Sequence, residues 1–218
     1  MYFSSRQFKK FILDYSILLA FSVATFALAL SPGPDNIFVM IQSISNGKKY
    51  GLATVAGLMT GCLIHTTLLA FGISAVIKNN PFILVSIKVF GALYLLYLSW
   101  IVLKADSDIT LNGQVVKDRS LLDLFRKGFI MNVLNPKVTI FFLAFFPGFL
   151  FSNEISNVVQ FYILGMLFIL VSSVVFGSIA LLAGTINGYL KKNRSTGFLL
   201  KWLQIIVFIA IAIYLVFG

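Results

Sequence analysis

The residues of this sequence that could carry chemistry lie in two short polar interruptions of long apolar runs. The first reads Ser31-Pro32-Gly33-Pro34-Asp35-Asn36, and the second reads Asn132-Val133-Leu134-Asn135-Pro136-Lys137. Proline breaks or kinks a helix, and lipid offers no partner for the backbone N–H and C=O groups that a break sets free. Such breaks occur at membrane depth where protein buries them or where they line a watery cavity. Paired breaks of this kind indicate a site for a small transported molecule.

Asp35 is the first candidate for direct chemistry. It stands within an apolar run, where a charge at a helix centre costs about 2.5–3.5 kcal/mol to insert. Such a cost favours a role in binding a proton or a substrate. The alternative is that its carboxylate caps the half-helix that begins at Asn36, by accepting the free N–H groups there. The two roles are compatible.

Lys137 follows Pro136 directly and leads into another apolar stretch. Its ammonium could bind a carboxylate or pair with Asp35, or it could be a lysine at a segment end whose charge reaches the interface. Free N–H groups at a broken helix suit a carboxylate and free carbonyls suit an ammonium, so a zwitterionic amino acid matches both. The predicted substrate-binding residues are Pro34, Asp35, Asn36, Asn135, Pro136 and Lys137.

His65 is the only histidine, and it lies on a helical stripe with Gly57 and Gly61. Small residues at this spacing let two helices approach closely. A histidine there could titrate near neutral pH and relay protons together with Asp35. The alternative is a hydrogen-bonded structural histidine at a helix interface.

Metal binding and enzyme catalysis have little support in the sequence. The apolar segments contain Asp35, Cys62 and His65 and few other metal-ligand types, whereas a transition-metal site needs several. We therefore expect no metal, no cofactor and no catalytic residues. Two alternative functions stay open: export of a divalent cation by the same fold, and a membrane-embedded enzyme or assembly factor in which the breaks serve folding alone.

The elements that must position these residues are transmembrane helices. The chain of 218 residues is 59% hydrophobic and 11% charged, a balance that a soluble domain of this size could not bury. Most of its apolar runs reach the ~20 residues that span a bilayer, and they lack the alternation of a membrane β-barrel. The sequence predicts an all-α bundle of six segments: 15–45, 52–77, 81–103, 128–151, 158–190 and 202–217.

The formal charge of +10 comes from 17 Lys and Arg against 7 acids. These basic residues cluster at the ends of apolar segments, which favours topology selection over nucleic-acid binding. The rule that cytoplasmic loops carry the positive charge places the connections after segments one, three and five in the cytoplasm. Six spans then put both termini outside. The alternative folds 15–45 as a re-entrant hairpin bent at 31–35 and keeps the N-terminus inside.

The two halves of the chain resemble each other. We expect one membrane domain over 1–218, with a first repeat at about 15–103, a cytoplasmic linker at about 104–127 and a second repeat at about 128–218. Each repeat begins with a broken segment. Three segments per repeat is an odd number, so the repeats would be inverted relative to each other.

Four motifs together resemble the lysine/homoserine-threonine exporter family (LysE/RhtB) of bacterial inner-membrane transporters. The resemblance implies a multi-pass amino-acid exporter driven by the proton gradient, with protons and an amino acid as its partners. The mechanism that we expect is alternating access around the predicted binding residues. The run after Pro136 carries no acid, which resembles the branch for neutral amino acids. A homodimer is left open. The motifs are Ser31-Pro32-Gly33-Pro34-Asp35, Gly57-Leu58-Met59-Thr60-Gly61, Gly91-Ala92-Leu93-Tyr94-Leu95 and Asn132-Val133-Leu134-Asn135-Pro136-Lys137.

Overall fold

The described part of the chain is helical and contains no strand in the computed structural model, which describes residues 15–31, 33–74, 81–104, 120–152, 154–192 and 194–217. The predictions that rest on 1–14, Pro32, Lys78 and most of the 104–127 linker lie outside these residues. The elements are α1 (Tyr15–Leu30), α2 (Pro34–Ser45), α3 (Lys48–Leu68), the π-helical turn η2 (Leu69–Ile73), α5 (Pro81–Lys104), α6 (Leu121–Val133), α7 (Pro136–Phe145), the 3-10 turn η3 (Phe146–Phe149), α8 (Asn157–Lys192) and α9 (Arg194–Phe217).

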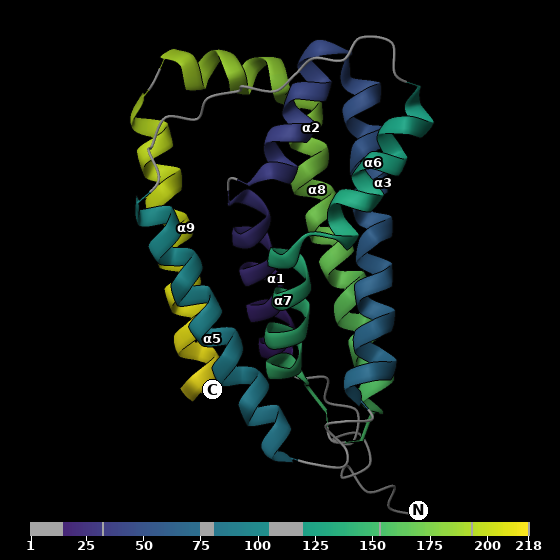
Figure 1. The fold of residues 1–218 in the computed structure, drawn as a ribbon, viewed down its shortest axis with the longest axis vertical. Coiled ribbons are helices and arrows are strands. Elements are labelled where there is room, and N and C mark those ends of the chain that lie inside the picture. The colour runs from purple at the N-terminus through teal and green to yellow at the C-terminus, as the bar shows by residue number, and fades with distance from the viewer. Residues whose placement is uncertain are drawn as a thin grey trace, which may run out of the picture.

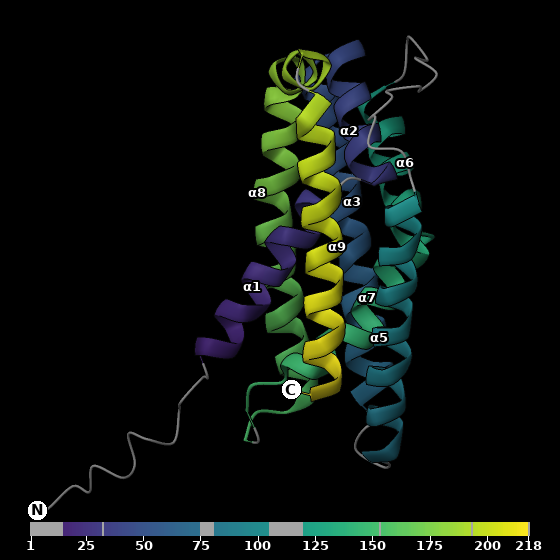
Figure 2. The same cartoon turned by 90° about the vertical axis from the view of Figure 1, so that its left-hand side faces the viewer.

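The helices stand roughly side by side in a bundle (Figure 1). In this view α3, α6 and α8 form one side, α5 and α9 form the other, and α1, α2 and α7 lie between them. The same order follows from the contacts, because α3 packs along α6 and α8, α5 packs along α9, and α1 and α2 pack on α8. The view turned by 90° shows that α1 slants away from the bundle toward its N-terminal end (Figure 2).

Two of the predicted segments are broken where the prolines interrupt them. The axes of α1 and α2 differ by 59°, and those of α6 and α7 differ by 52°. Both breaks lie near mid-height in Figure 1, and the chain ascends through α1 and α2 but descends through α6 and α7. The two broken pairs therefore run in opposite directions through the bundle.

The lengths of the helices fit a membrane protein. Three described helices are long and apolar enough to cross a bilayer, at Lys48–Ile73, Val85–Lys104 and Asn157–Ile186, and each bent pair can add one span for a total of up to five. Lys201–Phe217 is a shorter apolar helix. The all-α membrane class is confirmed, and the count of six segments stays a prediction.

One boundary differs from the sequence prediction. Helix α6 begins at Leu121, inside the segment 104–127 that was expected to be a linker. Ser120 and Asp123 form a capping box, in which each side chain bonds the backbone N–H of the other residue. Hydropathy alone did not indicate this helix start, because the first turns of α6 carry the charged residues Asp123, Arg126 and Lys127.

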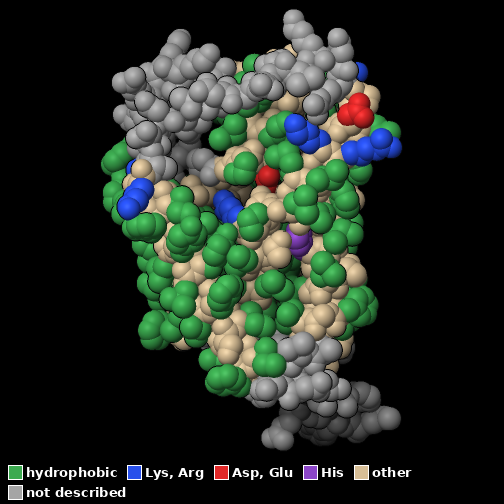
Figure 3. All heavy atoms as spheres, viewed as in Figure 1, with side chains coloured by type: hydrophobic (Ala, Val, Ile, Leu, Met, Phe, Trp, Pro, Cys, Tyr) green, Lys and Arg blue, Asp and Glu red, His purple; other side chains and the backbone are tan. Residues whose placement is uncertain are grey.

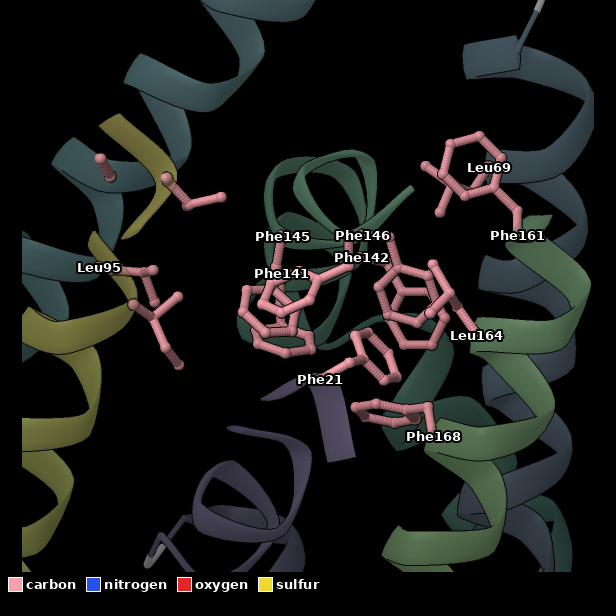
Figure 4. Packing of buried hydrophobic residues seen from close by; sticks show 14 of the residues in the cluster. Phe21, Leu69, Leu95, Phe141, Phe142, Phe145, Phe146, Phe161, Leu164 and Phe168 are labelled. Atoms are coloured by element: carbon pink, nitrogen blue, oxygen red, sulfur yellow. The ribbon is translucent and has the colours of Figure 1, made fainter. Parts of the chain in front are cut away.

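Phenylalanine side chains fill the core on the α7 side of the second break. Phe141, Phe142, Phe145 and Phe146 project from α7 and η3, and Phe21 of α1 packs among them (Figure 4). The ring centroids of Phe141 and Phe145 lie 4.3 Å apart, and those of Phe142 and Phe146 lie 4.2 Å apart. We call these five residues and Phe168 of α8 the aromatic cluster. It is an apolar, densely packed region next to the breaks.

Helices α3 and α6 approach to backbone contact. A Cβ atom on Gly57 would collide with the carbonyl of Phe125, and one on Gly61 would lie 2.6 Å from the side-chain oxygen of Asn132. Gly128 faces the carbonyl of Thr54 in the same way. The glycine stripe read from the sequence is therefore a close helix packing, and it holds the end of α6 against α3.

Candidate functional site

The two breaks meet through a side-chain hydrogen bond. The amide nitrogen of Asn135 donates to a carboxylate oxygen of Asp35 at 3.0 Å, which joins the start of α7 to the start of α2. Asp35 is buried. The carboxylate of Asp35 therefore accepts a hydrogen bond from the other broken helix. The capping hypothesis predicted instead that it would accept from a backbone N–H of its own helix. Near the N-terminus of α2 the charge is still favoured by the helix dipole.

Asn135 also caps the N-terminus of its own helix, α7. Its side-chain oxygen accepts from the backbone N–H of Lys137 at 3.0 Å, which makes Asn135 the N-cap of α7. Pro136 occupies the first helical position, where a missing N–H costs nothing because that group has no partner within the helix. The side-chain amide of Asn135 therefore caps the N-terminus of α7 and also hydrogen-bonds Asp35 at the start of α2.

At the first break, too, a side chain satisfies a backbone group that the break leaves free. Helix α2 begins at Pro34 after the extended residue Gly33. The side-chain nitrogen of Asn36 donates to the carbonyl of Ala29 at 2.8 Å, which satisfies a backbone group near the end of α1. These bonds explain how the break survives inside an apolar bundle, where an unpaired backbone group costs several kcal/mol.

Lys137 also reaches across to the first break. Its Nζ lies 3.5 Å from the hydroxyl of Ser31 and 5.4 Å from the ring centroid of Phe208 on α9. An ammonium and a carboxylate that line one pocket would attract each other. Among the described contacts, however, the two groups form no direct ion pair: Asp35 is bound by Asn135, and Lys137 by Ser31.

A pocket opens between the breaks. The centres of water-sized molecules can occupy about 50 Å³ of it, and it is bounded by residues of α1, α2, α3, α6, α7 and α8. In Figure 3 one acidic and one basic side chain show near the middle of the face, close to a histidine and among hydrophobic side chains. The polar lining residues are Asp35, Asn36, Asn132, Asn135, Lys137 and Ser172, and the apolar lining includes Leu28, Leu58, Met59, Phe141, Phe168 and Phe176.

The pocket gathers most of the residues proposed from the sequence. Pro34, Asp35, Asn36, Asn135 and Lys137 line it, while Pro136 does not. The exposed ring of Pro136 starts α7 behind Asn135.

His65 stands beside the pocket rather than in its lining. Its Nε2 lies 3.2 Å from the carbonyl of Asn132, and its ring packs on Phe142 at 5.4 Å between centroids. This is the arrangement expected of a hydrogen-bonded structural histidine.

Three polar residues of the site were not among the sequence candidates. Ser31 contacts Lys137, Asn132 lines the pocket next to Cys62, and Ser172 lines it from α8. Ser31 and Asn132 lie in the two proline-bearing motifs, so their position offered a signal. Ser172 lies inside a long apolar run with no such marker.

Comparison with known proteins decides the family. Residues 26–218 match the family described as "LysE type translocator". The chain belongs to this family. A relative from Salmonella typhimurium (strain LT2), "Homoserine/homoserine lactone efflux protein", is 32% identical over 172 residues, covering 79% of this chain and 82% of the relative. The protein of the same description from Salmonella typhi is 31% identical over 172 residues with the same coverage.

Membership of the LysE-type translocators settles the general class of activity. The protein is a transporter and not an enzyme, and it is a multi-pass protein of the inner membrane. No solved structure matches the chain.

Proposed function

We propose that this LysE-type translocator exports a neutral amino acid from the cytoplasm in exchange for protons, with the pocket between the two breaks as its binding site. The observation that carries the proposal is the placement of Asp35 and Lys137. They stand on different broken helices, line one pocket and each bond a neutral side chain, Asp35 with Asn135 and Lys137 with Ser31. An acid and a base kept separate can receive a ligand that carries both charges.

The pocket has the right groups for the backbone of an amino acid. The α-ammonium would bind Asp35, and the α-carboxylate would bind Lys137 as a charge-assisted pair. Helices α2 and α7 both begin at the pocket, so the positive ends of their dipoles favour the carboxylate as well. Because a zwitterion brings one charge of each sign, the net charge of the site does not change when the substrate binds.

The rest of the lining favours a neutral side chain. Asp35 is the one carboxylate among the described lining residues, and the walls beyond the breaks are formed mainly by Leu58, Met59, Phe168 and Phe176. A basic substrate would bring a second positive charge into this apolar region, where an unpaired charge is costly. The names of both Salmonella relatives state homoserine, a neutral amino acid, as what they export. We take homoserine as the first substrate to test.

Proton coupling follows from competition for one carboxylate. Asp35 can hold either the ammonium of the substrate or a proton. Loading from the cytoplasm needs the ionised form, and a proton taken up on the outer side displaces the substrate there. Each cycle then exchanges one amino acid for a proton, because the carboxylate of Asp35 holds one or the other when access alternates. His65 stands outside the lining, so the coupling is assigned to Asp35.

Inside-out membrane vesicles test the proposal. Their interior corresponds to the outside of the cell, so an acidic interior should drive accumulation of labelled homoserine. Asp35→Asn and Lys137→Gln should each reduce accumulation by roughly tenfold or more, since a charge-assisted hydrogen bond contributes ~1.5–3 kcal/mol. Glu154→Gln and Lys88→Gln are matched controls that change the same charges outside the pocket, and they should leave accumulation intact.

The outcome for Asp35→Asn separates its two roles. Loss of both gradient-driven accumulation and gradient-free exchange means that Asp35 binds the substrate. Loss of accumulation with retained exchange means that it binds the proton alone. Accumulation near the wild-type level in this variant would contradict the proposed site. Gradient-driven movement of a divalent cation, with none of any amino acid, would contradict the proposed substrate.

A further inference from the structure

A buried serine hydroxyl on α8 has no partner in the described structure. Four buried hydroxyl oxygens lack one there, those of Thr25, Ser43, Ser74 and Ser172, and of these residues Ser172 alone lines the pocket. Its side chain is 1% exposed. A buried polar atom without a partner is unfavourable, and it calls for an explanation such as a ligand absent from the structure.

The hydroxyl of Ser172 departs from the usual behaviour of serine in these helices. Ser22, Ser99 and Ser178 each donate to the carbonyl four residues earlier, at 2.8, 3.0 and 2.7 Å. That bond satisfies a hydroxyl inside an apolar helix. Ser178 lies on the same helix as Ser172, so the helix itself does not prevent the bond. The hydroxyl of Ser172 is left available to another group.

The neighbours of Ser172 define what it could bind. Phe168, Ser172 and Phe176 are spaced by four residues on one face of α8, and all three line the pocket. The charged groups Asp35 and Lys137 stand on the other elements of the lining, at the starts of α2 and α7. An amino acid held by its charges at the breaks would therefore extend its side chain over an apolar face that carries one hydroxyl.

We propose that Ser172 is a specificity-determining residue, which hydrogen-bonds an oxygen on the side chain of the transported amino acid and so selects hydroxylated substrates over apolar ones of the same size. The inference rests on the proposed function. A hydroxyl substrate satisfies Ser172, whereas an apolar isostere leaves the serine buried and unpaired. A site that bonds a substrate hydroxyl discriminates against the analogue lacking it for this reason.

The test compares homoserine with norvaline, in which a methyl group replaces the hydroxyl. Export of both labelled compounds is measured in vesicles containing wild type, Ser172→Ala or Ser178→Ala, and binding is measured as protection of the purified protein against thermal unfolding. Wild type should prefer homoserine. Ser172→Ala should weaken homoserine binding by about threefold to tenfold, as expected for one neutral hydrogen bond, and leave norvaline unchanged or improved. Ser178→Ala should keep the preference.

The ligand-free thermal midpoint separates recognition from a structural role. Because the Ser172 hydroxyl has no partner in the described protein, Ser172→Ala should be as stable as wild type or more stable. Equal weakening of homoserine and norvaline, an unchanged preference, or a clear loss of ligand-free stability in Ser172→Ala would each overturn the assignment of Ser172 while leaving amino-acid export intact. Absence of export and of binding for both compounds in wild type would instead overturn the proposed function, and this inference with it.

Discussion

Asn135 illustrates at the scale of a residue how folding and function share one side chain. Its oxygen caps α7 and its nitrogen holds Asp35. Because the two bonds use different atoms of the amide, substitutions can separate them. The same residue thus allows the local stability of a helix start to be measured apart from the geometry of the site.

Asn135→Ala and Asn135→Ser both remove the hydrogen bond to Asp35, but serine is also a good N-cap, so we expect the alanine variant to be less stable than the serine variant by about 1 kcal/mol. Both variants should export poorly, since neither carries an amide that reaches Asp35. Thermal unfolding in detergent and vesicle export measure the two effects. Equal stability of the Ala and Ser variants would show that the cap contributes little.

At the scale of elements, the two halves of the bundle pack in matching ways. The first broken pair, α1 and α2, packs on α8 of the second half, and α6 of the second broken pair packs on α3 of the first half. Likewise α1 contacts α9, and α7 contacts α5. This exchange of partners, with opposite chain directions in the two broken pairs, supports the proposal of inverted repeats.

The glycines of α3 give a prediction at this scale. Gly57→Ala places a methyl group against the backbone of α6 and should destabilise the protein by about 1–3 kcal/mol, as overpacking does. Gly177→Ala on α8 is the matched control, because no atom lies within 4 Å of its Cβ position and alanine favours the helix. Thermal unfolding of the purified proteins measures both. Equal midpoints for the two variants would mean that α3 and α6 can separate freely.

Helix α7 contributes residues to the aromatic cluster as well as to the pocket. Phe141 and Phe168 belong both to the cluster and to the lining of the pocket, so the pocket ends against packed rings on that side. In an alternating-access cycle, a barrier of this kind on one side of the site has to open when access changes. Helix α7 carries Lys137 and three of the six rings, Phe141, Phe142 and Phe145, so substrate bound at Lys137, as we propose, would contact the element that carries half of the barrier.

At the scale of the whole molecule, the distribution of charge predicts an orientation in the membrane. Lys and Arg side chains gather toward the end of the bundle where α3 and α6 begin (Figure 3). The chain turns by 59° between α1 and α2, whereas a re-entrant hairpin would have to reverse its direction. If α1 and α2 form one crossing, the positive-inside rule predicts that the basic end lies in the cytoplasm. The described basic residues near that end are Lys48, Lys49, Lys104, Arg126, Lys127 and Lys201.

Cysteine labelling tests this orientation. In a Cys62→Ala background, Lys49→Cys at the basic end should resist an impermeant thiol reagent in intact cells and react after the membrane is opened. Glu154→Cys, in the exposed connection before α8, should react in intact cells. The two positions control for each other, because the reversed pattern would place the basic end outside and overturn the direction of export.

The sequence by itself determined the class of the protein and the position of the breaks. Apolar runs of bilayer length form helices in any arrangement, and a proline interrupts a helix through its own ring and missing N–H. Both properties are local, so Pro34 and Pro136 could be read directly. The charge of Asp35 inside an apolar run was an equally local signal.

Only the tertiary structure decided which side chains meet. The sequence does not distinguish a serine that bonds its own helix, as Ser178 does, from a serine that faces a pocket unpaired, as Ser172 does. The close packing of α3 on α6 carries His65 to the carbonyl of Asn132 and leaves it out of the lining, which its helical spacing could not foretell. The physical reason is that a break depends on one residue's backbone, while a partner depends on how separate helices rotate and pack against each other.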